Sequence, residues 1–488
     1  LAYFYKVLYL CIVKPCKLTM CKSPSKVRQA SLFWDLEAML SPNNSLYKLA
    51  NLIDWNVFEQ SFAPLYSKDT GRMVKPIRLM VGLLILKHLR NVSDESVVEQ
   101  FSENAYFQYF CGMEAFRTDA PCVPTELVEF RRRIGESGME LILKESIRIN
   151  LSIDDQRKEE TMGKDGKDGR GRKPGAEQTA FIDTTVQEKN VTFPTDSKLL
   201  NKLIDFCHGV AEKENLKVRQ SYAREIKGLK LVQRFRGRKN SKGKVRKADK
   251  RMRTIAGRLL RELLRLLPDK NAYRERIDTC MRFVNGERLD GHKIYSLHEP
   301  DVLCISKGKE GKKYEFGNKV SIVRLWDGLI IGALSFRNEY DGHTIDKAME
   351  QVRRLYDRKI KALACDRGYR GQSMSGQTQI MIPDMPKKTD SQYAKNKKHK
   401  LFRKRAGIEP VIGHCKVDHR LGRNFYKGLF GDSINVMLAA AAFNFKRAMM
   451  LLLCLVERVI LWCCGRRELN FHHQFFPQVY MKNAMSPF

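Results

Sequence analysis

The stretch TAFIDTTV (residues 179–186) decides the predicted fold of this chain. Its β-branched and apolar residues favour a strand, because such side chains pack well on a half-buried pleated surface. Asp183 lies inside this strand, and an unpaired buried carboxylate is costly. Asp183 therefore indicates either a functional site on the strand or a core aspartate that is bonded to the backbone.

Two further strand patterns follow toward the C-terminus. YEFGNKVSIVRL (314–325) and LIIGALSFR (329–337) are rich in β-branched residues. Asp327-Gly328 lies between them and predicts a two-residue hairpin turn.

A helix and another strand come next. HTIDKAMEQVRRLYD (343–357) has the apolar spacing of an amphipathic helix, and IKALACD (360–366) is a short apolar strand that ends on Asp366. This order of elements predicts a mixed α/β sheet, and ligands usually bind where the strands of such sheets end. A simple turn or cap role is the alternative for Asp366.

A strongly basic segment separates the first strand from the hairpin. Residues 217–261 contain 18 lysines and arginines against two acids, Glu225 and Asp249. Apolar residues recur there at helical spacing, so we expect a basic helical insertion at about residues 196–288. A solvated helix face is the usual explanation of a charge run, but so large an excess favours contact with the DNA backbone. The expected contacts are Lys244, Arg246, Lys247, Lys250 and Arg251.

Residues 45–150 predict an all-α N-terminal domain. KPIRLMVGLLILKHLR (75–90) has a proline near a helix start, and Ser93 is suited to cap the next helix. PTELVEFRRRIGESG (124–138) predicts a third, basic helix that stops at one of its glycines. These features suggest a helix-turn-helix-like DNA-binding module, with a helical bundle that makes no DNA contact as the alternative.

The remaining segments flank or join these domains. Residues 1–44 are expected to be a leader that is partly non-native before Met20, and the charged, Gly-rich residues 151–177 predict a flexible linker. Residues 448–488 form a C-terminal tail. Within it, the apolar residues 449–464 contain a central Glu-Arg pair, which favours a partly buried helix over a membrane span.

The composition points to a polyanionic partner. The 488 residues carry a formal net charge of +34, and this self-repulsion opposes compaction unless a partner neutralises it. Nucleic acid is the leading partner, and an anionic membrane surface is the alternative. The 13 cysteines form no C-x-x-C pair, which argues against structural zinc and favours a reducing compartment.

A third carboxylate stands in the stretch FRKRAGIEPVIGHCK (402–416). Phe402, Arg405, Glu409 and Lys416 are separated by 3, 4 and 7 residues, so a continuous helix would place them on one face. Pro410 leaves two geometries open, a helix that kinks there or one that begins there. A plain amphipathic helix with an Arg–Glu pair is the simpler alternative.

Together, Asp183, Asp366 and Glu409 suit a pair of Mg²⁺ ions, with Mn²⁺ as the other candidate. Mg²⁺ prefers carboxylates, water and phosphate oxygens. Two such ions about 4 Å apart clamp the attacking and leaving oxygens of a phosphoryl transfer.

At this point the chain resembles bacterial insertion-sequence transposases of the DDE type, in the insertion-sequence-five group. The resemblance runs from about Leu32 to Met450. It is carried by FIDTTV, by CDRGYRG and by the signature Tyr-x2-Arg-x3-Glu-x6-Lys, in which Phe402 replaces the tyrosine. The stretch DHRLGRNFYKGLFGDSINVMLAAAAFNFKR (418–447) also looks like the C-terminal part of that family.

The resemblance implies an RNase H-like catalytic domain in which the three acids hold the metal ions. It implies cleavage at terminal inverted repeats, transfer of the freed 3′-hydroxyl to target DNA, and a homodimer on paired ends. DNA contacts are then expected from Phe402, Arg405, Lys416, Arg367 and Arg370. The expected location is the bacterial cytoplasm, at the nucleoid and not at a membrane. A DNA-binding protein that no longer cuts, or a metal-dependent nuclease without strand transfer, are the alternatives.

Overall fold

The computed structural model describes residues 35–463, apart from a set of gaps at 67–73, 163–177, 268–270, 287–292, 307–310, 383–388, 312, 338, 370 and 372. The proposed start at Met20, the end of the tail, Arg370 and most of the linker therefore lie outside the described residues.

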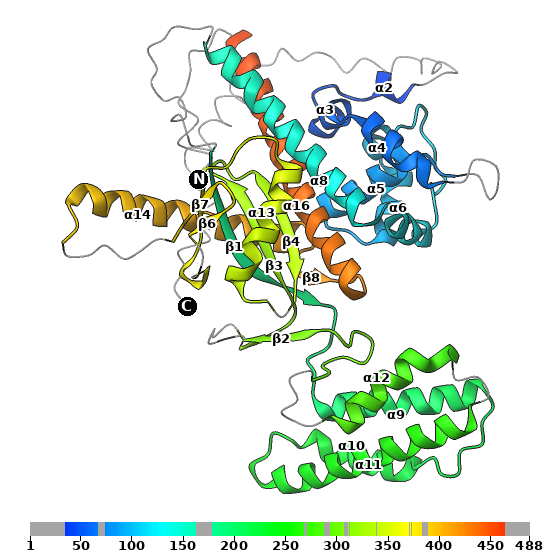
Figure 1. The fold of residues 1–488 in the computed structure, drawn as a ribbon. Helices are drawn as coiled ribbons and strands as arrows, with labels where there is room; N and C mark the ends of the chain where they lie inside the picture. Colours follow the sequence, from blue (N-terminus) through cyan, green and yellow to red (C-terminus); the bar gives the residue numbers. More distant parts are fainter. Residues whose placement is uncertain are drawn as a thin grey trace, which may run out of the picture.

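A mixed sheet forms the centre of the C-terminal part (Figure 1). Strand β1 (Thr179–Lys189) pairs antiparallel with β3 (Tyr314–Leu325) and parallel with β5 (Ala362–Ala364). The predicted mixed sheet is thus observed, and the strand that carries Asp183 lies inside it. The other strands are β2 (Leu303–Ser306) and β4 (Ile330–Phe336) beside β3, β7 (Thr378–Met381) beside β5, β6 (Met374–Ser375) beside β7, and β8 (Arg423–Asn424) beside the end of β1.

The β3–β4 hairpin differs from the predicted two-residue turn. The Leu325 amide donates to Leu329 O (2.8 Å) and the Gly328 amide donates to Leu325 O (3.1 Å), so three residues form the loop. Gly328 adopts φ 93°, which only glycine takes up easily. A turn closed by a left-handed glycine is the usual three-residue solution, because it matches the twist of the strands.

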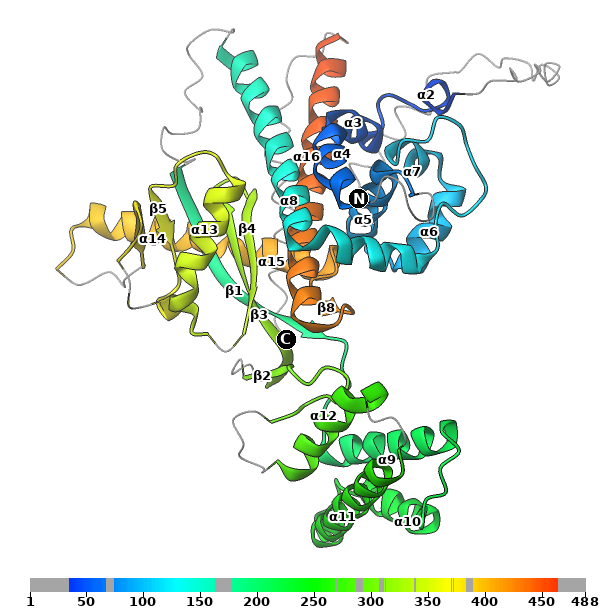
Figure 2. The same cartoon turned by 45° about the vertical axis from the view of Figure 1, so that its right-hand side comes forward.

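Helices cover both faces of this sheet (Figures 1 and 2). Helix α13 (Ile345–Leu355) lies on one face, and α15 (Ile408–Asp418) and α16 (Gly428–Cys463) lie behind the other. Helix α14 (Gln392–Ala406) projects away from the sheet. Asn444 of α16 bonds both the amide (3.0 Å) and the carbonyl (2.8 Å) of Ile330, which satisfies backbone groups on the edge strand β4.

Helix α16 is apolar enough to be compared with a membrane span. Within the described residues, Gly428–Leu453 passes that test by length and composition alone. However, 56% of its apolar window is buried inside the protein, as in the core helix of a globular fold. The helix predicted at the start of the tail is therefore observed as the continuation of α16.

The predicted basic insertion is a helical bundle below the sheet (Figures 1 and 2). Its apolar side chains form a hydrophobic core separate from the main one. Its helices are α9 (Asp196–Lys213), α10 (Ala223–Arg234), η3 (Lys239–Ser241), α11 (Lys242–Leu266), η4 (Asn271–Tyr273) and α12 (Arg274–Asn285).

A buried cluster of ion pairs joins the two ends of this insertion to the sheet. Lys189, at the end of β1, has a side chain that is 1% exposed. Its ammonium group pairs with Asp432 (2.7 Å) and with Glu299 (3.5 Å), which lies where the chain returns from the insertion. The two ends of the insertion are therefore held together by charge.

The N-terminal helices pack into the same core as the sheet. Helix α5 is buried around almost its whole circumference, and Ser93 caps α6 as predicted. Arg131, in the predicted basic helix, is turned inward onto Asp94 with two hydrogen bonds of 2.8 Å. This packing fits the helical bundle better than a free DNA-reading helix. The helices are α2 (Leu36–Met39), α3 (Ser45–Leu52), α4 (Trp55–Phe62), η1 (Ala63–Leu65), α5 (Ile77–Leu89), α6 (Asp94–Glu103), α7 (Ala105–Phe110) and α8 (Pro124–Met162).

Helix α8 runs further than the sequence predicts. Gly135 leaves the helical conformation (φ 66°), but a second helical segment follows and continues to Met162, inside the predicted linker. The reason is packing against α16: Arg157 donates to Leu451 O (2.7 Å), and Arg447 bonds Asn150 (2.6 Å). Residues 151–162 are thus helix, and not flexible linker.

A buried pair of histidines joins the N-terminal helices to the end of α15. The backbone carbonyl of His88 accepts from His419 Nδ1 (3.1 Å), and His88 Nδ1 approaches His419 O (3.4 Å). Burial lowers the pKa of His419 to about 4 and that of His88 well below its usual value, to which the charge of Lys87 adds. Both side chains are fully buried, so protonation must work against the fold.

We predict that acid destabilises the protein through this histidine pair. Between the ordinary pKa of histidine and pH 4 the unfolded chain binds more protons than the folded one, so the free energy of unfolding falls as the pH falls. Each histidine contributes up to about 1.4 kcal/mol per pH unit in that range. Urea titrations from pH 7 to pH 5 measure the slope. His419→Gln should flatten it and His399→Gln, on exposed α14, should not; equal slopes would refute the assignment.

Candidate active site

Strand β1 holds Asp183 at the surface of the sheet, with its side chain 18% exposed. The carboxylate Oδ1 accepts a hydrogen bond from the backbone amide of Thr184 (2.8 Å), which restricts its orientation. The backbone on either side is fixed by pairing with β3, where Asp183 lies opposite Ile322.

The parallel pairing of β1 and β5 brings Asp366 beside Asp183. Phe181 pairs with Ala364, and each aspartate follows its partner by two residues along strands that run in the same direction. The Asp366 side chain is 47% exposed, and its Oδ1 accepts from the amide of Arg367 (2.7 Å). The structure therefore brings together the two acids that the sequence analysis selects on separate strands.

Arg405 lies between these two aspartates. Its guanidinium is 3.4 Å from Asp183 Oδ2 and 3.7 Å from Asp366 Oδ1, and its side chain is 11% exposed. Its Nε has no hydrogen-bond partner within the described residues. A cation that is largely shielded from water between two carboxylates offsets their repulsion, and Arg405 faces the acids here instead of pointing outward.

Glu409 approaches the site from a different helix than Arg405. Helix α14 ends at Ala406 and α15 begins at Ile408, with Gly407 (φ −64°, ψ −5°) as the one residue between them. Phe402 and Arg405 thus belong to α14, whereas Glu409 and Lys416 belong to α15, so the four residues do not lie on one uninterrupted helix. Pro410 lies in the first turn of α15, where its missing N–H costs no helical hydrogen bond.

The break at Gly407 has a visible cause. Arg324, on β3, donates to the carbonyl of Lys404 in the last turn of α14 (2.8 Å). A Cβ atom on Gly407 would lie 2.7 Å from Arg324 Nη2, so a larger residue here would displace this guanidinium group. The guanidinium caps the negative end of α14 and holds Arg405 toward the acids.

The charges of the three acids are coupled. Burial raises the pKa of Asp183; the charges of Asp366 and Glu409 raise it further, and Arg405 opposes the rise. Glu409 is solvent-exposed on the first turn of α15, where the helix dipole favours an acid. Glu409 thus acts on the charge of Asp183, although no three acidic, His or Cys side chains among the described residues are arranged as ligands of one ion.

The other predicted DNA contacts that lie in the described residues belong to four elements. Arg367 is exposed next to Asp366, Lys416 is partly exposed on α15, and Phe402 lies on α14 with a side chain outside the described set. On α11, Arg251 pairs with Glu225 (2.5 Å). The other predicted DNA contacts on α11 are exposed: Lys244, Arg246, Lys247 and Lys250.

Sequence reasoning missed Arg324 and Asp341. Arg324 is buried on β3, and burial lowers its pKa to about 10. Asp341 accepts from Thr184 Oγ1 (2.9 Å), beside Asp183. Only long-range pairing brings Arg324 and Asp341 to the site, so no local sequence pattern predicts their role. A charged residue inside a strand pattern was the one available signal for Arg324.

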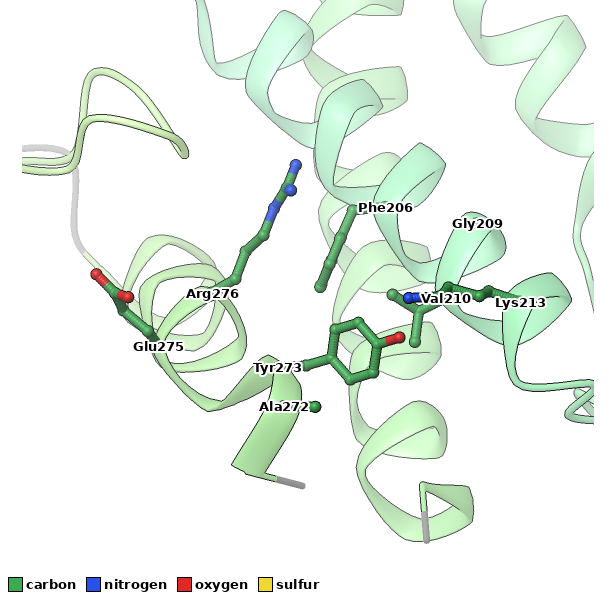
Figure 3. Close-up of a pocket in the computed structure, with 8 residues that line it drawn as sticks. All are labelled: Phe206, Gly209, Val210, Lys213, Ala272, Tyr273, Glu275 and Arg276. Carbon is green, nitrogen blue, oxygen red and sulfur yellow. The ribbon is translucent and has the colours of Figure 1, made fainter. Parts of the chain in front are cut away.

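A cavity of about 520 Å³ lies in the helical insertion (Figure 3). Arg276 lies over the Phe206 ring (4.6 Å) and Lys213 near the Tyr273 ring (5.7 Å). The aromatic faces are thus already covered by the protein's own cations. The cavity is lined by Phe206, Gly209, Val210, Lys213, Ala272, Tyr273, Glu275 and Arg276.

Comparison with known proteins identifies the two main parts of the chain. A model described as a transposase domain (DUF772) matches residues 34–133, and one described as a transposase DDE domain matches residues 288–445. An uncharacterized protein, ORF8 in the nfe locus of Rhizobium meliloti, is 38% identical over 197 residues, which cover 40% of this chain and 87% of that protein. No solved structure matches the chain.

The central β1 strand, the parallel β5 neighbour and the adjoining acids define an RNase H-like catalytic fold of the DDE class, as predicted. The chain belongs to the family of transposases that carry a DDE domain. The DDE match includes Asp366 and Glu409, whereas Asp183 precedes it and is tied to the site by strand pairing. Membership implies DNA as the substrate and, in general, a divalent metal.

We predict that Gly407→Ala destabilises the protein by about 1–3 kcal/mol, because the added methyl group displaces Arg324 from its bond to Lys404 O. Gly413→Ala is the matched control in α15: its Cβ meets nothing within 4 Å, and we expect a gain of about 0.5–1 kcal/mol. Guanidinium denaturation compares the two. Similar unfolding midpoints would contradict the proposed role of Gly407.

Proposed function

We propose that this transposase cuts DNA at terminal inverted repeats and joins the freed 3′-hydroxyl end to target DNA by two-metal phosphoryl transfer. The observation that carries the proposal is the convergence of Asp183 and Asp366 around Arg405, with Glu409 close enough to shift the pKa of Asp183. Three acids from three separate elements have no evident packing role at this surface.

The acids fit divalent metal ions in their chemistry. All three offer carboxylate oxygens, the donors that Mg²⁺ and Mn²⁺ prefer. The position of Arg405 supports this fit, because its positive charge already lies between Asp183 and Asp366. Asp183, Asp366 and Glu409 would hold the ions after Arg405 moves toward a DNA phosphate.

When bound, the ions would supply charge neutralisation at the attacking and leaving oxygens. In cleavage, a water oxygen bonds to phosphorus, the P–O3′ bond breaks, and the 3′ oxygen takes a proton. In joining, that 3′-hydroxyl oxygen bonds to a target phosphorus, and its proton passes to the departing target 3′ oxygen. The number of phosphodiester bonds is unchanged in joining, so no outside energy source is needed.

The basic elements suit the DNA backbone on either side of the acids. Helix α14 has no buried residue in its described part, and Lys400 and Arg403 are exposed on it. A helix that is polar all round and projects from the fold needs a partner or solvent on every side. The exposed lysines and arginines of α11 would bind DNA further from the cleavage point.

The assembly and its location follow from the same proposal. Two transposon ends must be held together before joining, which favours a homodimer with one catalytic site at each end. The place of action would be the bacterial cytoplasm, at the nucleoid.

We predict that Asp183→Asn, Asp366→Asn and Glu409→Gln each abolish cleavage and leave DNA affinity nearly unchanged, because each removes a metal ligand and no phosphate contact. Cleavage is measured on labelled repeat-end DNA with Mg²⁺, and affinity is measured by gel shift in EDTA.

Glu350→Gln is the control, since Glu350 is an exposed acid on α13 away from the site. Full-rate nicking by Asp366→Asn would contradict the site. Cleavage without joining by the unaltered protein would favour a nuclease.

We predict that replacing Lys244, Arg246, Lys247 and Lys250 by Gln weakens binding to all DNA sequences alike. Each lost phosphate contact should reduce the slope of log affinity against log salt by about one. Lys347 and Arg354 on α13, which are paired with acids, are the control substitutions. An unchanged slope would exclude α11 as a DNA contact.

A further inference from the structure

Strand β1 carries a second polar side chain directly after Asp183. Thr184 donates its amide to Asp183 Oδ1 (2.8 Å) and its hydroxyl to Asp341 Oδ2 (2.9 Å). The other Asp341 oxygen accepts from Lys319 Nζ on β3 (2.7 Å). Thr184 thus joins two hydrogen-bonded groups: its hydroxyl bonds the Lys319–Asp341 pair, and its backbone amide bonds Asp183.

The Lys319–Asp341 pair is partly shielded from water. The side chains of Lys319 and Asp341 are 30% and 22% exposed, so their ion pair is stronger than a fully exposed one. The charge of Lys319 also balances Asp341, which therefore adds no net charge beside the other acids. Asp341 begins the short helix η5 (Asp341–Thr344), and Thr344 donates to its carbonyl (2.7 Å).

Tyr369 completes the arrangement from the Asp366 side. It ends the short helix η6 (Arg367–Tyr369), and its amide donates to Asp366 O (3.1 Å). The side chain is 1% exposed, and its hydroxyl has no hydrogen-bond partner of normal geometry within the described residues. Burial raises its pKa, and the charges of Asp183 and Asp341 add to the rise.

We propose that Asp341 is a positioning residue for the metal-binding carboxylates, acting on Asp183 through Thr184. The proposal rests on the proposed metal-dependent function. Residues that hold metal ligands in place commonly change metal affinity or activity by about 10- to 100-fold when they are replaced. A role confined to tying η5 to the sheet would lower stability and leave metal affinity unchanged.

The test measures Mn²⁺ binding to the full chain by electron paramagnetic resonance, together with the metal concentration that gives half-maximal cleavage. Asp341→Asn should raise the Mn²⁺ dissociation constant and the half-maximal concentration about tenfold, with DNA affinity unchanged in EDTA. Asp346→Asn is the matched control, because Asp346 also bonds a hydroxyl, Ser375 Oγ (2.6 Å), which belongs to strand β6.

A second pair of variants keeps the test decisive if Asp341→Asn is poorly folded. Thr184→Val removes the hydroxyl and should weaken metal binding, whereas Thr184→Ser keeps the hydroxyl and should restore it. Unchanged Mn²⁺ affinity in Asp341→Asn and Thr184→Val, with an unaltered protein that binds Mn²⁺, would overturn the role of Asp341 alone. No Mn²⁺ binding by the unaltered protein would overturn the metal-dependent function as well.

Discussion

The catalytic part depends on the backbone pairing of β1 with a neighbour on each side. The antiparallel register with β3 fixes which residues of β1 face the site, and the parallel register with β5 sets Asp183 beside Asp366. A slip of one residue in either pairing would turn one aspartate to the opposite face of the sheet. Many cooperative backbone hydrogen bonds therefore fix the positions of the two aspartates. The repulsion between their carboxylates is too weak to change this strand pairing.

Positively charged side chains then offset the repulsion between these carboxylates. Arg405 lies between the two aspartates, and Arg324 fixes the helix end that delivers it. Gly407 permits the close approach of Arg324 and also starts the new helix that carries Glu409. The short junction between α14 and α15 thus determines the positions of both Arg405, which offsets the charge of the aspartates, and Glu409, the third acid.

The sequence predicts the parts of the site that have local patterns. Asp183 and Asp366 stand in or after short apolar strands, and the signature around Glu409 has fixed spacings, so all three could be found without coordinates. The register that joins them, the break at Gly407 and the inward turn of Arg405 arise from contacts with β3 and could not. The linker prediction failed for a similar reason: polar residues 151–162 stay helical because Arg157 and Arg447 bond across to a distant helix.

The two hydrophobic cores give the protein an uneven capacity for evolutionary change. The N-terminal helices share their core with the catalytic sheet, so neither can be exchanged without rebuilding the other. The insertion has its own core, and Lys189 and Glu299 bring its two ends together at one point of the sheet. Such a layout allows the basic helices of the insertion to be lengthened, shortened or replaced during evolution without a change in the sheet that carries the acids.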